Sequence, residues 1–487
     1  MQFFQKIHPS YFIITFCIGV VIGAILCFVT KTIILSSPLW AILSVILMLI
    51  AVIIARPPLL FFSVIAGILI VITRASPTSI SQEYFQHIIG QNILISGCIS
   101  KDPTESSSGK YNVTLDNLKT DRALSGQLFV QLKSLDISDS AHLERSDCLV
   151  VQGEVTEGFG VYQASILRPE IQSVDRYSQS NIFLIFRNQF AKRVKDYIPS
   201  PESGLALGYL LGQKSGVDQK IQEALRTVGL THIIVASGAH LGVLINLARK
   251  SFGKLSRFAS FLGAALLMVL FISITGLSPS MLRAGLVTIF SLTCWYFGRK
   301  IQPTRLILIV AAITLIYNPF YLIDLAWLLS FASFIGILIL SPTISKFFYG
   351  KSRQPNYIFS ILISSFSAAL LCIPIMIYYF GQFSIISIIA NLLILPTISI
   401  VMGLTFCTGI FSFFLPPIAV ILGRITTFII GYQTSVVNFF AEQSVFLVEM
   451  ETGNPAIFLL YIPLVFVFII NACYSRYKLR QFCKKLA

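Results

Sequence analysis

The residues best suited to chemistry lie in the short run Ala236-Ser237-Gly238-Ala239-His240, which places a hydroxyl near an imidazole. Nucleophilic catalysis needs a histidine oriented toward the serine and donors that stabilise an oxyanion. Ser237 and His240 are three residues apart, so on one helix they would be neighbours. Gly238 between them instead favours a packing corner, with a neutral His240 that satisfies a helix break. A serine hydrolase is therefore the less favoured interpretation.

A zinc or nucleotide site has no support in the sequence. A hydrolytic zinc site needs several clustered histidine and acidic ligands and one open position for water. The chain has five histidines and no His-x-His-x-Asp-His run, and it lacks the Gly-x-x-x-x-Gly-Lys-Ser/Thr pattern of a phosphate-binding loop. We therefore expect no metal, no cofactor and no nuclease centre in this sequence. The histidines are His8, His87, His142, His232 and His240.

Composition places these residues in a membrane protein. Of the 487 residues, 55% are hydrophobic and 12% are charged, and the mean hydropathy is +0.81. A soluble chain carries about 25% charged residues, so a soluble multidomain enzyme is excluded. The net charge of +15 would indicate nucleic-acid binding only if the basic residues clustered. They lie mainly in short loops between apolar runs, as the positive-inside rule predicts.

Apolar runs near the ~20 residues that cross a bilayer predict about 12 spans, including broken or re-entrant helices. Three runs precede a polar insert and the others follow it. Leu306–Tyr317 is short, so it is either a half-span or part of a longer helix. The runs are Tyr11–Thr30, Leu39–Ala55, Leu59–Thr73, Leu230–Leu247, Phe258–Gly276, Ser280–Phe297, Leu306–Tyr317, Leu322–Leu340, Tyr357–Phe380, Ile385–Phe411, Ile418–Phe439 and Ala456–Cys473.

The charges at the ends of these runs predict which side of the membrane each end faces. Cytoplasmic loops retain lysine and arginine, and basic residues occur here at alternate ends. The ends near 277–279 and 381–384 are uncharged, and the end near 442–451 is acidic. Both termini are therefore expected in the cytoplasm, with the polar insert on the outer side. The basic residues are Arg56, Arg249, Lys250, Lys254, Arg257, Arg299, Lys300, Arg305, Lys346, Lys351, Arg353, Arg476, Lys478, Arg480, Lys484 and Lys485.

Three regions follow from this layout: N-terminal transmembrane helices at 1–74, an exported β domain at 75–180 and a second transmembrane domain at 181–487. The insert alternates apolar and polar residues in five short runs, at 93–99, 111–115, 126–132, 148–155 and 161–166. Such a pattern suits a small closed barrel of the OB type. OB barrels often bind single-stranded nucleic acid. The insert holds 13 acidic and 8 basic residues, so a structural or docking role is favoured.

Two of the nine cysteines, Cys98 and Cys148, lie on expected strands of the exported insert. An oxidising compartment permits a disulfide, so their pairing is a hypothesis that depends on the separation of their Cα atoms. Cysteines within spans are usually small core residues. Those are Cys17, Cys27, Cys294, Cys372, Cys407 and Cys473.

An amphipathic segment and a glycine-rich segment follow the insert. Residues 181–198 carry phenylalanines at helical spacing with basic residues on other faces, so a helix in the outer membrane interface is expected. Residues 201–229 hold glycines inside helical patterns. Such interruptions at membrane depth occur where irregular backbone lines a cavity.

A series of short motifs runs from residue 210 to residue 396: LLGQKSG at 210–216, LRTVGLTH at 225–232, ASGAHLG at 236–242, SPSMLRA at 278–284, LLSFA at 328–332, GQFS at 381–384 and NLLILP at 391–396. Their order and spacing over about 190–403 resemble the ComEC family, and the insert lies where that family has its N-terminal OB-like domain. Two positions depart from the family pattern, since Gln213 stands where an acidic residue is common and Ala239 replaces a bulkier apolar residue. Many relatives continue into a metallo-β-lactamase-like domain, whereas this chain is expected to be a short form.

The resemblance implies a channel of the bacterial inner membrane, not an enzyme, that passes one DNA strand into the cytoplasm during natural transformation. It also implies an exported DNA receptor, a cytoplasmic motor or DNA-binding proteins, and a separate nuclease as partners. A permease for another anionic substrate is the main alternative, and an intramembrane serine hydrolase is the lesser one.

The polar residues of these motifs are the candidates for the DNA path. Ionisable groups at membrane depth are costly unless they pair or face water. Arg283, Asp324 and Asn391 are expected near the outer face, and His240 near the midplane. A structural salt bridge between Arg283 and Asp324 is the alternative. The candidates are Arg226, His232, Ser237, His240, Arg283, Asp324, Gln382, Asn391 and Pro396.

Overall fold

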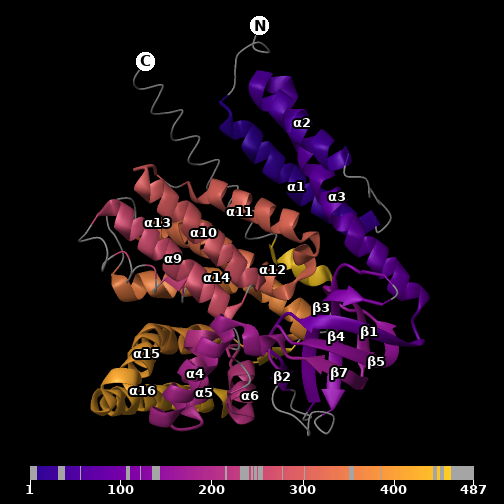
Figure 1. The fold of residues 1–487 in the computed structure, drawn as a ribbon. Helices are drawn as coiled ribbons and strands as arrows, with labels where there is room; N and C mark the ends of the chain where they lie inside the picture. The colour runs from indigo at the N-terminus through magenta and orange to yellow at the C-terminus, as the bar shows by residue number, and fades with distance from the viewer. Residues whose placement is uncertain are drawn as a thin grey trace, which may run out of the picture.

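Helices make up most of the protein. The computed structural model describes residues 8–30, 39–54, 56–105, 110–120, 122–133, 143–213, 216–230, 256–276, 278–300, 302–349, 356–384, 386–442, 447–449 and 455–461, with 241, 242, 245 and 249. Within these ranges, seven helices are long and apolar enough to cross a membrane, and two shorter apolar helices accompany them. The chain is therefore a polytopic α-helical membrane protein, as its composition predicted, with a β domain at one side (Figure 1).

Each span predicted within the described residues coincides with a helix, while Leu230–Leu247 and Ala456–Cys473 fall mostly outside those residues. The short run at 306–317 is part of a helix that begins at Pro303. The run at 322–340 continues through three consecutive helical segments to Tyr349. The helices are α1 (Ser10–Thr30), α2 (Leu39–Ile54), α3 (Leu60–His87), α9 (Arg257–Thr275), α10 (Pro279–Tyr296), α11 (Pro303–Tyr317), α12 (Leu325–Ile335), η6 (Gly336–Leu340), α13 (Ser341–Tyr349), α14 (Tyr357–Phe380), α15 (Ser387–Phe414) and α16 (Pro416–Glu442).

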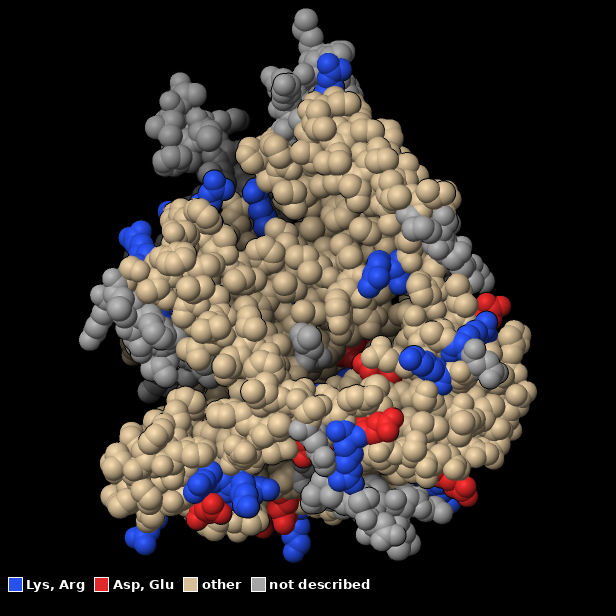
Figure 2. Space-filling view, viewed as in Figure 1, with Lys and Arg blue, Asp and Glu red and all other residues tan. Residues whose placement is uncertain are grey.

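Small residues bring α1 and α3 into close backbone contact. A Cβ atom on Gly19 or Gly23 would overlap the backbone of Val64 or Ile68 in α3, and one on Gly67 would overlap the backbone of α1. Lipid supplies no hydrophobic force between helices. Glycines let the two backbones approach closely, so that van der Waals contact holds the helix pair together. Figure 2 shows a broad uncharged surface over the helical part, and many of the charged side chains lie near the barrel and along the lower edge.

The β domain is a closed five-stranded barrel, which confirms the OB-type prediction. The strands β1 (Asn92–Ile99), β3 (Lys110–Lys119), β4 (Gln127–Lys133), β6 (Tyr162–Leu167) and β5 (Cys148–Glu157) pair in that order, and β5 returns to β1. The pairing of β4 with β6 is parallel, and the other pairings in the ring are antiparallel. Two short strands were not predicted, β2 (Thr104–Glu105) on β3 and β7 (Glu170–Asp175) on β5.

The barrel core comes from alternate residues of its strands and from the end of α3. Strand side chains alternate between two faces, and Ile95, Leu128, Leu149 and Ile166 are fully buried at the centre. The helix α3 continues past residue 75 to His87 and places Phe85 in the same core. The barrel is thus attached to the helical part through a continuous helix rather than through a loose linker.

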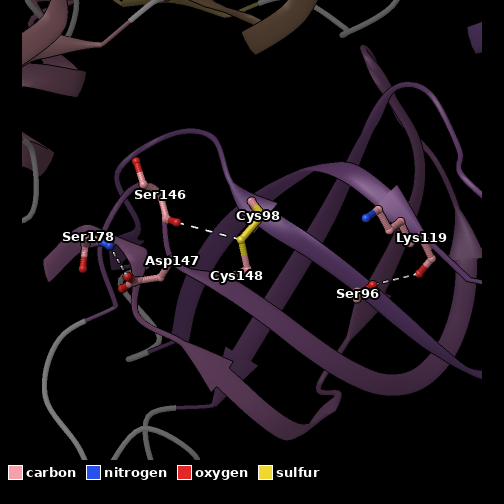
Figure 3. The surroundings of a disulfide bond; sticks show 7 residues. All are labelled: Ser96, Cys98, Lys119, Ser146, Asp147, Cys148 and Ser178. Atoms are coloured by element: carbon pink, nitrogen blue, oxygen red, sulfur yellow. Dashed lines mark hydrogen bonds between the residues drawn. A yellow bond between two sulfur atoms is a disulfide. The ribbon is translucent and has the colours of Figure 1, made fainter. Parts of the chain in front are cut away.

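A disulfide joins β1 to β5 (Figure 3). Cys98 and Cys148 are directly opposite each other in the register of these antiparallel strands, which is the geometry that the predicted pairing requires. The carboxylate of Asp147, next to Cys148, accepts hydrogen bonds from the backbone N–H groups of Ser178 (3.0 Å) and Glu144 (3.0 Å). The disulfide and the hydrogen bonds of Asp147 thus both stabilise the start of β5, where the loop at 143–147 ends.

The glycine-rich segment forms two short helices that pack against α15 and α16. These are α5 (Glu202–Leu211), in which Ser203 through Leu211 are all buried, and α6 (Gln219–Thr227). The helix α5 ends at Gly212, which has φ of +73°. The amphipathic helix α4 (Ile182–Tyr197), expected at the membrane interface, packs Phe190 against Gly409 and Phe406 of α15.

We predict that replacing both bridging cysteines by serine destabilises the barrel. Closing a loop with a sequence separation of 50 residues restricts the unfolded chain, and a disulfide typically contributes about 2–4 kcal/mol. The thermal unfolding of the full chain in detergent should shift downward for C98S/C148S and remain near wild type for C294S. Labelling of both Cys98 and Cys148 in the unfolded, non-reduced protein would contradict the bridge.

Candidate functional site

The start of α10 holds a buried cation. Ser278 caps this helix, because its Oγ accepts a hydrogen bond from the backbone N–H of Met281 (3.2 Å), and Pro279 is its first residue. Arg283 follows one turn later with only 9% of its surface exposed. Its guanidinium carbon lies 5.0 Å from the centroid of the Phe334 ring, and its Nε is buried without a hydrogen-bond partner. A cation–π contact thus supports this charge.

Asp324 has a different partner from the one considered in the sequence. Its carboxylate caps α12, because it accepts a hydrogen bond from the backbone N–H of Trp327 (2.9 Å). The indole N–H of Trp327 donates a hydrogen bond to Thr314 Oγ1 (3.0 Å). Within the described ranges the one ion pair joins Arg187 to Asp102. Arg283 and Asp324 therefore form no salt bridge there, and Asp324 serves as a helix cap.

Two of the sequence motifs meet beside Arg283. Ser280 in α10 and Ser330 in α12 are 50 residues apart in the chain, and their Oγ atoms are 3.2 Å apart. Ser330 is buried and Ser280 is half-buried. The region around Arg283 thus combines a buried cation with hydroxyl groups from two helices.

A second set of polar groups lies on α15 and α16. The Oδ1 atom of Asn391 is buried without a partner, and Pro396 lies inside α15, where it removes a backbone hydrogen bond. Gln433 of α16 donates from Nε2 to Thr397 Oγ1 (2.7 Å), while its Oε1 has no partner. Sequence reasoning missed Gln433, although an amide side chain inside an apolar helix is the signal that would have found it.

The remaining candidates lie elsewhere. Gln382 begins the short strand β8 (Gln382–Ser384), opposite Glu449 of β9 (Leu447–Glu449). Arg226 is exposed in the last turn of α6. His232, Ser237 and His240 lie outside the described residues, so the Ser–His interpretation stays a prediction. Among the residues that are described, no three His, Cys, Asp or Glu side chains gather into a metal-binding group.

The barrel docks on the helices through charged and polar groups that the sequence did not reveal. Arg187 of α4 is 3% exposed and donates from one nitrogen to both carboxylate oxygens of Asp102 (2.8 and 3.0 Å). Beside it, Asn188 Nδ2 is 2.8 Å from both oxygens of Glu144. These contacts bind the loops at one end of the barrel to α4.

Arg145 makes the third docking contact, with the end of α9. Its guanidinium donates to the carbonyl oxygens of Ser273 (2.9 Å) and Ile274 (3.1 Å), which belong to the last helical turn, where carbonyls lack intrahelical partners. Burial lowers the pKa of Arg145. Gly276, the first residue after α9, has φ of +93°, and a Cβ atom there would overlap the Arg145 side chain. The barrel therefore sits beside the end of α9 and the start of α10.

The sequence is similar to a known protein family and to one characterised protein. A family model described as "Competence protein" matches residues 209–473, a region that includes Arg283, Asp324, Asn391 and Gln433. The chain is also similar to "ComE operon protein 3" of Bacillus subtilis (strain 168), with 28% identity over 216 residues, 44% of this chain and 27% of that protein. The matched part is thus well under two thirds of that relative's length. No solved structure matches significantly.

We predict that breaking the Arg187–Asp102 pair loosens the barrel from the helices. Asp102→Ala leaves a buried guanidinium without its carboxylate, a change that typically costs about 3 kcal/mol. The midpoint of thermal unfolding in detergent should fall for D102A and recover in D102A/R187M. Removal of the exposed carboxylate of Glu170, as E170A, is the matched control, and an equal effect of D102A and E170A would contradict a docking role.

Proposed function

Since the chain belongs to the competence protein family, we propose that it is an inner-membrane channel that passes single-stranded DNA into the cytoplasm during natural transformation. The observation that carries the proposal is the buried guanidinium of Arg283, which has no carboxylate partner among the described residues. A phosphate group that enters a region of low dielectric needs such a fixed positive charge. A guanidinium also matches phosphate oxygens in a bidentate geometry.

The charges at the two ends of α10 support an outer position for the barrel. Arg145 binds the last turn of α9, so the turn that leads into α10 is on the barrel side. The opposite end of α10, about 27 Å away at 1.5 Å per residue, is followed by Arg299 and Lys300. Basic loops remain in the cytoplasm. This arrangement favours cytoplasmic termini and an exported barrel.

The other polar groups have roles that follow from their chemistry. Ser280 and Ser330 would donate hydrogen bonds to phosphate oxygens beside Arg283. Asn391 and Gln433 each keep one acceptor oxygen without a partner, so they would accept hydrogen bonds from base edges. Pro396 lacks the N–H that would bond to the preceding turn of α15. We place Arg226, His232, Ser237, His240, Asp324 and Gln382 on or beside the same path.

The proposal also includes partners. An exported receptor would deliver the DNA, a cytoplasmic motor or DNA-binding proteins would draw the strand inward, and a separate nuclease would degrade the other strand. The channel itself would need no cofactor. The lipid bilayer completes the surroundings of the helical part.

Deletion of the gene in a transformable host tests the function directly. We expect DNA to bind the cell surface as in wild type, while the amount of nuclease-resistant, internalised DNA falls to background. Expression of the chain from a second locus should restore internalisation. Unchanged internalisation in the deletion strain would overturn the proposal and leave a permease for another anion as the better interpretation.

We predict that Arg283→Ala loses most uptake while Arg283→Lys retains part of it. Hydrogen bonds to charged groups contribute about 1.5–3 kcal/mol, which corresponds to roughly a tenfold loss or more. Uptake is measured as internalised label, together with protein level and thermal stability in detergent. Arg257→Ala is the control, because it removes an exposed basic residue at the start of α9, away from the barrel. Normal uptake by R283A would remove the phosphate role, and loss of the folded protein would indicate a structural role.

A further inference from the structure

A cleft of about 1120 Å³ lies between the barrel and the helices. Its barrel wall comes from β1, β3 and β5, and its other wall comes from Pro279 at the start of α10, Tyr317 at the end of α11 and Tyr321 in the following turn η5 (Pro319–Ile323). Figure 2 shows the surface hollowed where the barrel meets the helical part. Small-molecule pockets measure about 300–1,000 Å³, so this cleft has room for part of a polymer.

Three tyrosines give the cleft flat surfaces. Tyr177 follows β7 and is 59% exposed, and Tyr317 is 56% exposed on the opposite wall. The rings of Tyr317 and Tyr321 have centroids 6.2 Å apart and are inclined by 37°. Exposed aromatic rings are the platforms on which bases of single-stranded nucleic acid stack, whatever their sequence.

The charges in the cleft differ from those of the whole barrel. Its lining includes Lys101, Lys119 and Arg145, against the two carboxylates Asp116 and Asp175. Burial raises the pKa of Asp116. The acidic excess of the barrel as a whole therefore does not extend into this cleft.

The position of the cleft connects it with Arg283. Pro279 forms part of its wall and lies four residues before Arg283 in the same helix, a distance of about 6 Å along the axis. A strand held in the cleft would thus leave it near the buried guanidinium. This continuity distinguishes the cleft from the other aromatic group of the barrel, Phe129, Phe159 and Tyr162, whose rings pack on one another with centroids 5.0–5.5 Å apart and do not line the cleft.

We infer that the cleft between barrel and helices is a binding site for a segment of single-stranded DNA, whose bases stack on Tyr177, Tyr317 and Tyr321 and whose phosphates face Lys101 and Lys119. The inference rests on the proposed function and names where the strand is first held. It makes binding a joint property of both domains, because two of the three rings come from the helical part.

The test measures the affinity of the full-length protein in lipid nanodiscs for a fluorescent oligothymidylate. Its length is about 4–16 nucleotides, the range of site sizes of an OB fold. Y317A/Y321A should raise the Kd at least about fivefold, since base stacking contributes about 1–3 kcal/mol per base. Y317F/Y321F keeps the rings and should bind as wild type. Phe159→Ala, on the other aromatic group, should also bind as wild type.

Three results would overturn the inference. The first is unchanged binding by Y317A/Y321A, and the second is loss of binding by F159A alone, which would place the strand on the outer barrel face. The third is equal loss by the alanine and phenylalanine pairs, which would show that stacking is not the interaction. The unfolding temperature of each variant shows whether it is folded. If Y317A/Y321A is misfolded, the Kd values of the single variants Y317A and Tyr177→Ala decide whether the rings bind DNA. If the site fails while deletion still abolishes uptake, the proposed function stands, and binding without any uptake defect would overturn only the function.

Discussion

Hydrocarbon offers no hydrogen-bond partner, and this constraint governs most of the helical part. Backbone groups are satisfied within helices, and buried hydroxyls bond back to their own helix, as Thr314 Oγ1 does to the Val310 carbonyl (3.0 Å). The carboxylate of Asp324 is likewise used by a helix start. The exceptions are therefore informative. Within the described residues they include Arg283 Nε, Asn391 Oδ1 and Gln433 Oε1, which our proposal places on the path of a polar polymer, and also Thr405 Oγ1 and Arg249 Nε, which it does not use.

The barrel obeys a different constraint, because its core is complete without the membrane. Its strands close on themselves, and one residue of α3, Phe85, fills the core from the helical side. The contacts that dock it are directional and polar, from Arg145, Arg187 and Asn188. Because these bonds fix the barrel at a few points rather than over a broad apolar face, space remains between the two parts, and that space is the cleft.

Charge averages describe the two parts poorly. The chain is strongly basic and its β domain is acidic by count, yet interactions between exposed charges weaken beyond about 8–10 Å at ordinary salt. The charges that an anion meets are those that surround it. In the cleft, Lys101, Lys119 and Arg145 come from three separate segments of the barrel, so their common location is a property of the folded barrel.

The sequence by itself determined the class of protein, the spans that the structure describes and the five strands of the barrel. These features depend on hydrophobicity and on its periodicity, and both can be read from short stretches of the chain. The sequence also singled out Cys98 and Cys148 as a possible pair, but the strand register decides that they face each other. The strand β7 was missed because most of its residues are exposed, so no buried face marks it. Only the tertiary structure decided that Asp324 caps a helix instead of pairing with Arg283, that Ser280 meets Ser330, and that Arg187 binds Asp102. Such partnerships depend on how elements far apart in the chain cross and dock, and no local pattern encodes that geometry.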